Sequence, residues 1–218
     1  MRAATWRYKR DVMAQNYMHI MFSKGARTRQ MKAGSYDAYA RMMAGATGQA
    51  DLLGPRELDF IAARDSFYLS SVAGSGWPYI QHRGGLVGFL KSLGGNRLGF
   101  ADFRGNKQFI STANLAENDR VALFLMDYPG QARLKLIGHA QIVERGDDPA
   151  LVDALMTADY RAVPERALVI DVIGFDWNCP QHIVPRYTEA EISQGIAPLV
   201  QEIEALRAEI VRLKSTTD

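Results

Sequence analysis

The stretch RVALFLMDYPGQARLKLIGHAQIVE, Arg120–Glu144, carries the clearest fold signal in the chain. Two apolar runs, RVALFLMDY and RLKLIGHAQIVE, stand on either side of the turn-forming letters PGQA. Apolar runs of this length, bounded by proline and glycine, are typical of strands buried on both faces of a sheet. We therefore predict two long strands joined by a tight turn.

Shorter strand signals surround this pair. Turns rich in glycine separate several of them, and only two short helices interrupt the series, one after Gly105 and one after the cap Asp148-Pro149. Closely spaced strands with few helices between them favour an antiparallel barrel over alternating strand–helix units. The further predicted strands are FYLSSV (67–72), WPYIQH (77–82), LVGFLKSL (86–93), RLGFAD (97–102) and RALVIDVIGFDW (166–177).

The two ends of the chain have sequence patterns typical of helices. We predict an N-terminal helical arm over residues 1–64, the barrel over residues 65–187 and a C-terminal amphipathic helix over residues 188–218. The predicted fold class is therefore mainly β with helical arms (α+β). In the last helix apolar side chains alternate spacings of three and four, which is the seam of a coiled coil. The seam either docks on the barrel of the same chain or pairs with the helix of another subunit. Its residues are Ile196, Leu199, Ile203, Leu206, Ile210 and Leu213.

Composition excludes several classes of partner. The 218 residues carry 26 Lys and Arg against 24 Asp and Glu, so no excess of positive charge favours a nucleic acid or a membrane surface. We find neither an apolar run long enough to span a membrane nor an export leader. The single cysteine, Cys179, excludes an internal disulfide, and Cys179 with His182 makes no convincing metal site. We expect a cytoplasmic protein with no metal, no nucleic acid and no membrane partner.

A second stretch, GFADFRGNKQFISTANL (99–115), predicts an anion site. A strand here runs into Arg104 and Lys107, and a helix that began at this point would add unpaired N–H groups and a partial positive charge. Asn106, Gln108 and Ser111 can donate further hydrogen bonds. The alternative is that the two cations are simply solvated.

The segment WPYIQHRGG (77–85) adds a second cation. Arg83 ends a strand that we expect to neighbour the strand carrying GFAD, so that its guanidinium reaches the same anion as Lys107. His82, beside it, either points into the cleft or lies on the opposite face of the strand, because neighbouring side chains alternate.

The segments ARDSFYLSSVAGSGWPYIQHRGG, FADFRGNKQFISTANLAENDRVALFLMDY, RLKLIGHAQIV and FDWNCPQHI resemble a known family, and together they cover over half the chain. They are similar to the FMN-binding split barrels related to pyridoxamine 5′-phosphate oxidase. The resemblance implies a six-stranded antiparallel split β-barrel. It also implies a homodimer with one FMN in each of two clefts between the subunits.

The resemblance also implies roles for individual residues. Arg83 and Lys107 fall on the positions that bind the FMN phosphate in the family. The family has a second basic residue at the position of Asn106, and Arg104 would compensate for its absence here. The backbone of Phe100–Asp102 falls beside the flavin ring, although Ala101 replaces a threonine of the oxidase. Gln131 or Arg133 would approach from the partner subunit, and Trp177 and Asn178 would close the cleft. The full set of candidate cofactor-binding residues is Gln81, His82, Arg83, Phe100, Ala101, Asp102, Arg104, Asn106, Lys107, Gln108, Ser111, Gln131, Arg133, Trp177 and Asn178.

Two functions are consistent with these signals. The first is an FMN-dependent oxidoreductase that acts on a small organic substrate, with NAD(P)H or oxygen as redox partner; the flavin carries the chemistry, so we nominate no catalytic residue. The arginine-rich carboxy-terminal signature of the oxidase is missing, which argues against pyridoxamine phosphate as the substrate. The second function is a non-catalytic protein that holds flavin or haem in the same cleft for storage or sensing.

Overall fold

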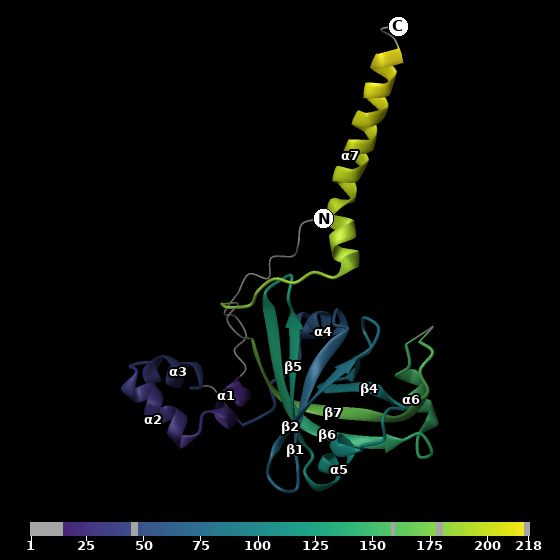
Figure 1. The fold of residues 1–218 in the computed structure, drawn as a ribbon. Helices are drawn as coiled ribbons and strands as arrows, with labels where there is room; N and C mark the ends of the chain where they lie inside the picture. The colour runs from purple at the N-terminus through teal and green to yellow at the C-terminus, as the bar shows by residue number, and fades with distance from the viewer. Residues whose placement is uncertain (1–14, 45–47, 158–159, 178–180, 216–218) are drawn as a thin grey trace.

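The computed structural model describes residues 15–44, 48–157, 160–177 and 181–215. Its centre is one antiparallel sheet of seven strands in the order β2-β1-β5-β6-β7-β4-β3 (Figure 1). The sheet confirms the predicted α+β split barrel, with one strand more than the six expected. The strands are β1 (Ser66–Val72), β2 (Pro78–Gly84), β3 (Lys91–Gly94), β4 (Arg97–Phe103), β5 (Arg120–Asp127), β6 (Ala132–Glu144) and β7 (Pro164–Trp177).

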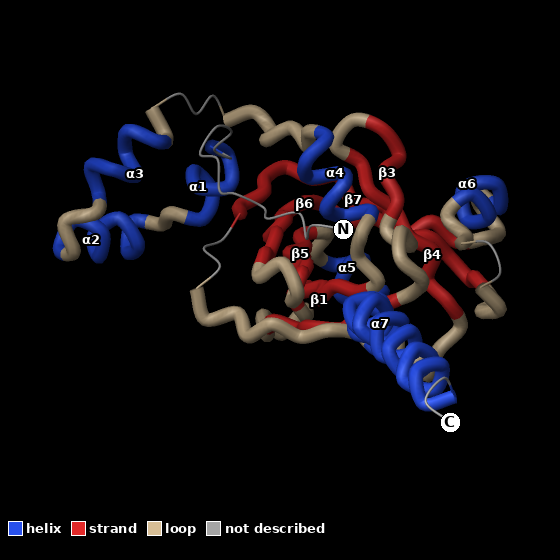
Figure 2. Tube along the Cα trace, turned by 90° about the horizontal axis from the view of Figure 1, so that it is seen from above, coloured by secondary structure: helices blue, strands red, loops and turns tan. Residues whose placement is uncertain are grey.

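Helices surround the sheet on several sides (Figure 2). Helices α1 to α3 form the arm beside the barrel, α4 lies against its core, and α5 and α6 follow β4 and β6. No helix within the described ranges is long and apolar enough to cross a membrane. The helices are α1 (Gln15–Met21), α2 (Lys24–Lys32), α3 (Tyr36–Met42), α4 (Pro55–Ala62), α5 (Ile110–Glu117), α6 (Pro149–Ala154) and α7 (Glu189–Ser215).

The sheet curls so that its two ends approach each other. Strands β2 and β4 are not neighbours in the sheet, which corrects our expectation, yet Arg83 of β2 bonds to Asp102 of β4 across the gap. Helix α5 lies near this gap and is tied to the first two strands by two hydrogen bonds. The Oγ of Ser111 donates to Gln81 of β2, and the Nδ2 of Asn114 donates to Ser71 of β1.

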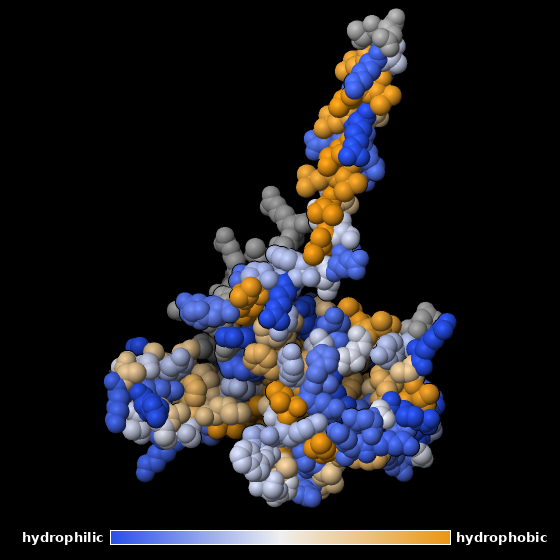
Figure 3. Space-filling view, in the orientation of Figure 1, coloured by the Kyte–Doolittle hydropathy of each residue, from blue (hydrophilic) through white to orange (hydrophobic). Residues whose placement is uncertain are grey.

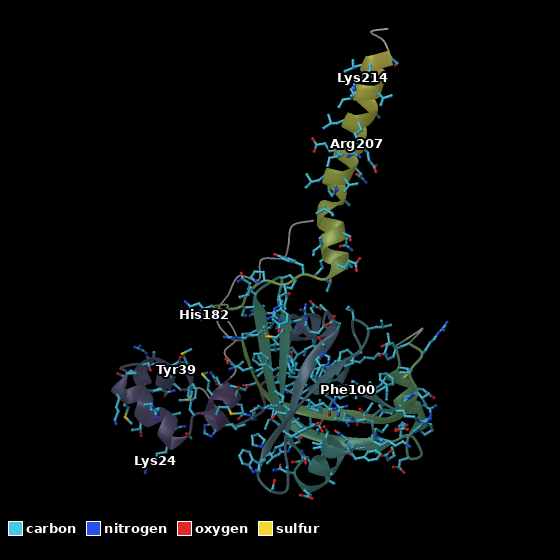
Figure 4. The ribbon with its side chains drawn as sticks, viewed as in Figure 1. Lys24, Tyr39, Phe100, His182, Arg207 and Lys214 are labelled. Carbon is cyan, nitrogen blue, oxygen red and sulfur yellow. The ribbon has the colours of Figure 1, made fainter. Side chains whose placement is uncertain are left out.

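The core fills the interior of the curled sheet with aromatic and branched side chains. Phe67, Phe89 and Phe100 form a cluster of ring contacts, with centroids 5.4 to 6.1 Å apart. Figure 4 labels Phe100 within the barrel. Phe60 and Ile61 of α4 are fully buried in the same core, so α4 belongs to the barrel although it precedes the first strand.

Three local predictions differ from the structure. Strand β5 is buried on one face only, because Val121, Leu123 and Leu125 are buried while the side chains between them are half-buried. Residues 86–90 of LVGFLKSL are not strand, since β3 begins at Lys91. The helix expected just after Gly105 begins at Ile110.

The arm is tied to the barrel through one carboxylate in the segment between them. Asp51 accepts hydrogen bonds from the backbone N–H groups of Asn16, Tyr17 and Phe175, at 2.9, 2.9 and 3.4 Å. Close packing accompanies this tie, because a Cβ added at Gly174 of β7 would lie 3.0 Å from the backbone of Tyr17. Helix α1 is therefore held directly on β7.

Helix α7 stands away from the barrel, as the long yellow helix of Figure 1 shows. It begins as predicted, with a capping box in which the Thr188 N–H donates to Glu191 and the Glu191 N–H donates to the Thr188 Oγ. None of its residues is buried within the single chain. Of the two alternatives for the apolar seam, docking on its own barrel is therefore not the arrangement observed.

Gly138 of β6 lies where the pairing with β7 shifts register, and a side chain there has no room. A Cβ at this position would clash with the carbonyl oxygen of Asp171 and lie 3.1 Å from the Cα of Val172, both of them backbone atoms of β7. We expect Gly138→Ala to lower the free energy of unfolding by about 1–3 kcal/mol, since the two strands must separate locally. Urea unfolding measures this loss.

Gly146 provides the matched control, because a Cβ added there meets no atom within 4 Å. Gly146→Ala should change stability by no more than about 0.5 kcal/mol. Similar losses for the two variants would contradict the steric explanation.

Candidate functional site

A polar hollow lies where β2 and β4 approach each other and the loop before α5 passes over them. Strand alternation places Tyr79, Gln81 and Arg83 of β2 on the face that lines it. Seven of the predicted cofactor-binding residues line the hollow, and they come from β2, β4, the loop and α5. These residues are Gln81, Arg83, Asp102, Asn106, Lys107, Gln108 and Ser111.

Asp102 is the central group of the hollow. One of its oxygens accepts from Arg83 Nη1 at 2.6 Å and the other from Arg166 Nη1 at 3.0 Å. The three side chains are only 10–14% exposed, so this is an ion pair network largely shielded from water. Arg166 also bonds to Glu144, which faces it across β6 and β7.

The surroundings of Arg166 favour its charged form. Burial alone would lower the pKa of Arg166, but its hydrogen bond to Asp102 and the nearby charge of Glu144 outweigh that effect and raise the pKa. The hydrogen bond from Arg104, together with the charges of Arg166 and Lys107, lowers the pKa of Glu165. Both shifts favour the charged forms of Arg166 and Glu165.

Arg83 has an unused donor. Its Nε is buried, and no residue in the described part of the chain accepts a hydrogen bond from it. Its other contacts are Asp102 and the ring of Phe100, whose centroid lies 5.8 Å from the guanidinium carbon. A buried N–H without a partner is costly in a folded protein, so the atom is suited to a ligand that brings an acceptor.

Lys107 lies in an irregular loop and not at a helix N-terminus. Lys107 and Phe109 both adopt left-handed backbone conformations, with φ of 59° and 53°, and α5 begins only after them. Asn106 stabilises the turn by accepting a hydrogen bond from the N–H of Gln108. Lys107 is exposed and lines the hollow, so it provides a solvent-accessible cation beside the two largely buried arginines.

Other predicted residues lie elsewhere in the single chain. Phe100 and Ala101 are buried in the two core clusters, so only their backbone is available to a ligand. His82 lies on the opposite face of β2, against Tyr68, and Arg104 points outward to pair with Glu165 at 2.8 Å. These two side chains do not line the hollow.

Trp177, expected to close the cleft, and Gln131 and Arg133, expected to come from the partner subunit, do not line the hollow in the single chain. Trp177 donates from its indole N–H to Glu57 of α4 and packs on Phe60. Gln131 donates to the carbonyl of Ile183, and neither it nor Arg133 lines the hollow. Asn178 and Cys179 lie outside the described residues.

Sequence reasoning missed Arg166 and Glu165, which open the buried run of β7. Asp102 and Arg166 are partners in the β4–β7 register, and that pairing cannot be read from the letters PERALVI. The available signal was the presence of two charged residues directly before a fully buried strand.

An antiparallel sheet that curls until β2 meets β4 defines the split β-barrel class. The model of the pyridoxamine 5′-phosphate oxidase family matches residues 53–172, which is more than half of the chain. The chain belongs to this family. No match was found among curated proteins.

Several solved structures are similar to part of this chain. HupZ from Group A Streptococcus is 13% identical, with a TM-score of 0.47 over 62% of this chain and 100% of the other. An FMN-binding protein from Syntrophomonas wolfei is 15% identical, with a TM-score of 0.41 over 69% and 97%. General Stress Protein 26 from Bacillus anthracis is 15% identical, with a TM-score of 0.41 over 56% and 91%.

Proposed function

We propose that this protein binds FMN, with the phosphate in the hollow beside Arg83 and the flavin serving as a redox cofactor. The observation that carries the proposal is the buried Nε of Arg83, which lacks an acceptor and stands next to Arg166 and Lys107. A phosphate monoester has the oxygens that these donors require, and charge-assisted bonds of this kind are strong. Membership of the pyridoxamine 5′-phosphate oxidase family supports the same cofactor class.

The charge around the hollow fits a single phosphate. Three cations, Arg83, Lys107 and Arg166, line the hollow together with the two carboxylates Asp102 and Glu165, which leaves one net positive charge. The chain has no GxGxxG turn, the usual cradle for a dinucleotide pyrophosphate. Both features favour FMN over FAD.

The proposal includes a homodimer in which the flavin site is shared. In the single chain the outer face of β5 is only half covered, and Phe124 and Met126 lie on it. A second barrel packed on such a face would complete its burial. Residues that lie away from the hollow in one chain, such as Arg133, would then come from the other subunit.

The bound flavin would supply hydride or electron transfer, and the protein would supply binding and orientation. Arg83 and Arg166 would hold the phosphate, with Lys107 adding a screened charge at the rim. The hydrogen bond of 2.8 Å from Ser111 to Gln81 holds α5 beside the hollow, and both side chains line the hollow. A small organic substrate other than pyridoxamine phosphate would react at the ring, and no side chain is assigned a catalytic role.

The identity of the ligand is the direct test. We expect mass spectrometry of ligand released by heat, after reconstitution with a mixture of flavins, to show FMN in large excess over FAD. Recovery of FAD alone, a haem absorption spectrum, or failure to take up FMN would each contradict the proposal. Reduction of the bound flavin by NAD(P)H faster than that of free FMN would support an enzyme; no acceleration would favour the non-catalytic alternative.

A further inference from the structure

An apolar stripe runs along α7 and is exposed over its whole length. The side chains of Leu199, Ile203, Leu206 and Ile210 are 49–60% exposed in the single chain. Figure 3 shows orange apolar residues following the helix away from the barrel. A stripe of this size on a helix of which no residue is buried by the described part of the chain marks an interaction surface.

The order of the apolar residues specifies what covers the stripe. In heptad notation Ile196, Ile203 and Ile210 occupy the a positions, and Leu199 and Leu206 occupy d positions. Isoleucine at a with leucine at d favours parallel coiled coils of two strands. The partner that this pattern fits is therefore an identical helix.

The flanking charges agree with a parallel pair. Glu202 and Glu209 occupy g positions, and Arg207 and Lys214 occupy the e positions that follow them. In a parallel pair in register, Glu202 of one helix lies opposite Arg207 of the other, and Glu209 lies opposite Lys214. An antiparallel pair would instead bring like charges together. Figure 4 labels Arg207 and Lys214 on α7, far from the barrel.

From this pattern we infer that α7 pairs with α7 of a second copy of the chain as a parallel two-stranded coiled coil in register. The Glu202–Arg207 pair is the cleaner of the two charge pairs, because Glu209 already bonds to Arg212 of its own helix. The inference does not depend on flavin binding.

Pro198 limits how strong this pairing can be. Proline lacks the N–H that would bond to the carbonyl of Gln194, so the continuous helix α7 lacks one backbone hydrogen bond there, although Pro198 occupies a c position outside the seam. The seam beyond Pro198, from Leu199 to Leu213, is short, and isolated helices shorter than about 12–15 residues are marginal by themselves. The coiled coil therefore needs a second contact between the subunits, which raises the local concentration of the two helices.

Disulfide trapping in the full chain tests the geometry. In a Cys179→Ser background, Ile210→Cys places two thiols face to face in the parallel seam, whereas Ala208→Cys, at an outward f position, keeps them apart. We expect most of the Ile210→Cys protein to form a linked dimer under mild oxidation, at least about fivefold more than Ala208→Cys, given the Cα separation that a disulfide requires. Equal linking of the two variants, or no linking of Ile210→Cys, would overturn the inference.

Charge reversal tests the partner. Glu202→Lys and Arg207→Glu each place like charges together in a homodimer, and a mixture of the two restores opposite charges in the heterodimer. Both variants also carry Ile210→Cys. We expect the linked heterodimer in about tenfold excess over the amount that random pairing of the two variants gives, because the weak charge pairs act together. If linked homodimers and heterodimers formed in the proportions of random pairing, the parallel register would be overturned. Neither experiment uses flavin, so its outcome is separate from that of the cofactor test.

Discussion

Replacing Asp102 by asparagine should lower the free energy of unfolding by about 3 kcal/mol, because it leaves two buried arginines without their shared counter-charge. Asp102 joins Arg83 and Arg166, and all three side chains are at most 14% exposed. Asparagine keeps the size of the side chain and removes the charge. For a chain of this length the midpoint of thermal unfolding should fall by roughly 6–12 °C, which calorimetry of the flavin-free protein measures.

Asp171 is the matched control, since it pairs with Arg97 at 3.1 Å but both side chains are about half exposed. Asp171→Asn should cost less than about 1 kcal/mol, as exposed ion pairs usually do. If the two variants lost the same stability, burial of the Asp102 network would not be the cause. A flavin phosphate bound in the hollow should recover part of the loss in Asp102→Asn, because it replaces the missing negative charge.

Replacing Arg83 by alanine should weaken FMN binding by roughly ten- to a hundredfold, since a charged hydrogen bond contributes about 1.5–3 kcal/mol. The fold should tolerate the change, because Asp102 keeps its bond to Arg166. Riboflavin lacks the phosphate and should bind the variant almost as well as the original protein. Lys107→Ala should show the same selectivity with a smaller loss, because its charge is exposed and screened. Fluorescence titration of both flavins into the original protein and the two variants gives the six affinities.

Arg97→Ala controls for the loss of one positive charge, because Arg97 lies on β4 but does not line the hollow. Lys91 and Lys135 serve less well as controls. Lys91 donates to the carbonyls of Ala154 and Met156, and Lys135 bonds to Asp176, so their loss would disturb packing. Equal losses of FMN and riboflavin affinity in Arg83→Ala would place the phosphate elsewhere.

The strands could be predicted because their signals are local. The turns GSG, GGN and PGQA separate apolar segments whose lengths agree with β1 to β7, apart from residues 86–90. The helix at Ile110 was predicted too early because left-handed conformations at Lys107 and Phe109 delay it, and neither residue type announces that geometry. The second face of β5 is only half-buried within the single chain, because an apolar run does not show whether the same chain or a partner covers each face.

The candidate site was predictable only in part. Arg83 and Lys107 were found from charge next to predicted breaks, and both line the hollow. Arg166 was not found because its role depends on the register of β7 with both β4 and β6, and register is set by tertiary packing. The contact between β2 and β4 has the same origin, since it arises from the curl of the whole sheet.

The tie at Asp51 bears on where a minimal functional fragment of this protein can begin. A fragment starting at residue 65 would lose Phe60 and Ile61 from the core, and one starting after Asp51 would leave the Phe175 N–H without its acceptor. Strand β7 would also lose the backbone of Tyr17 that covers Gly174. The segment ahead of the barrel is thus a structural part of it, and shortened versions for expression or crystallisation should retain the chain from α1 onward.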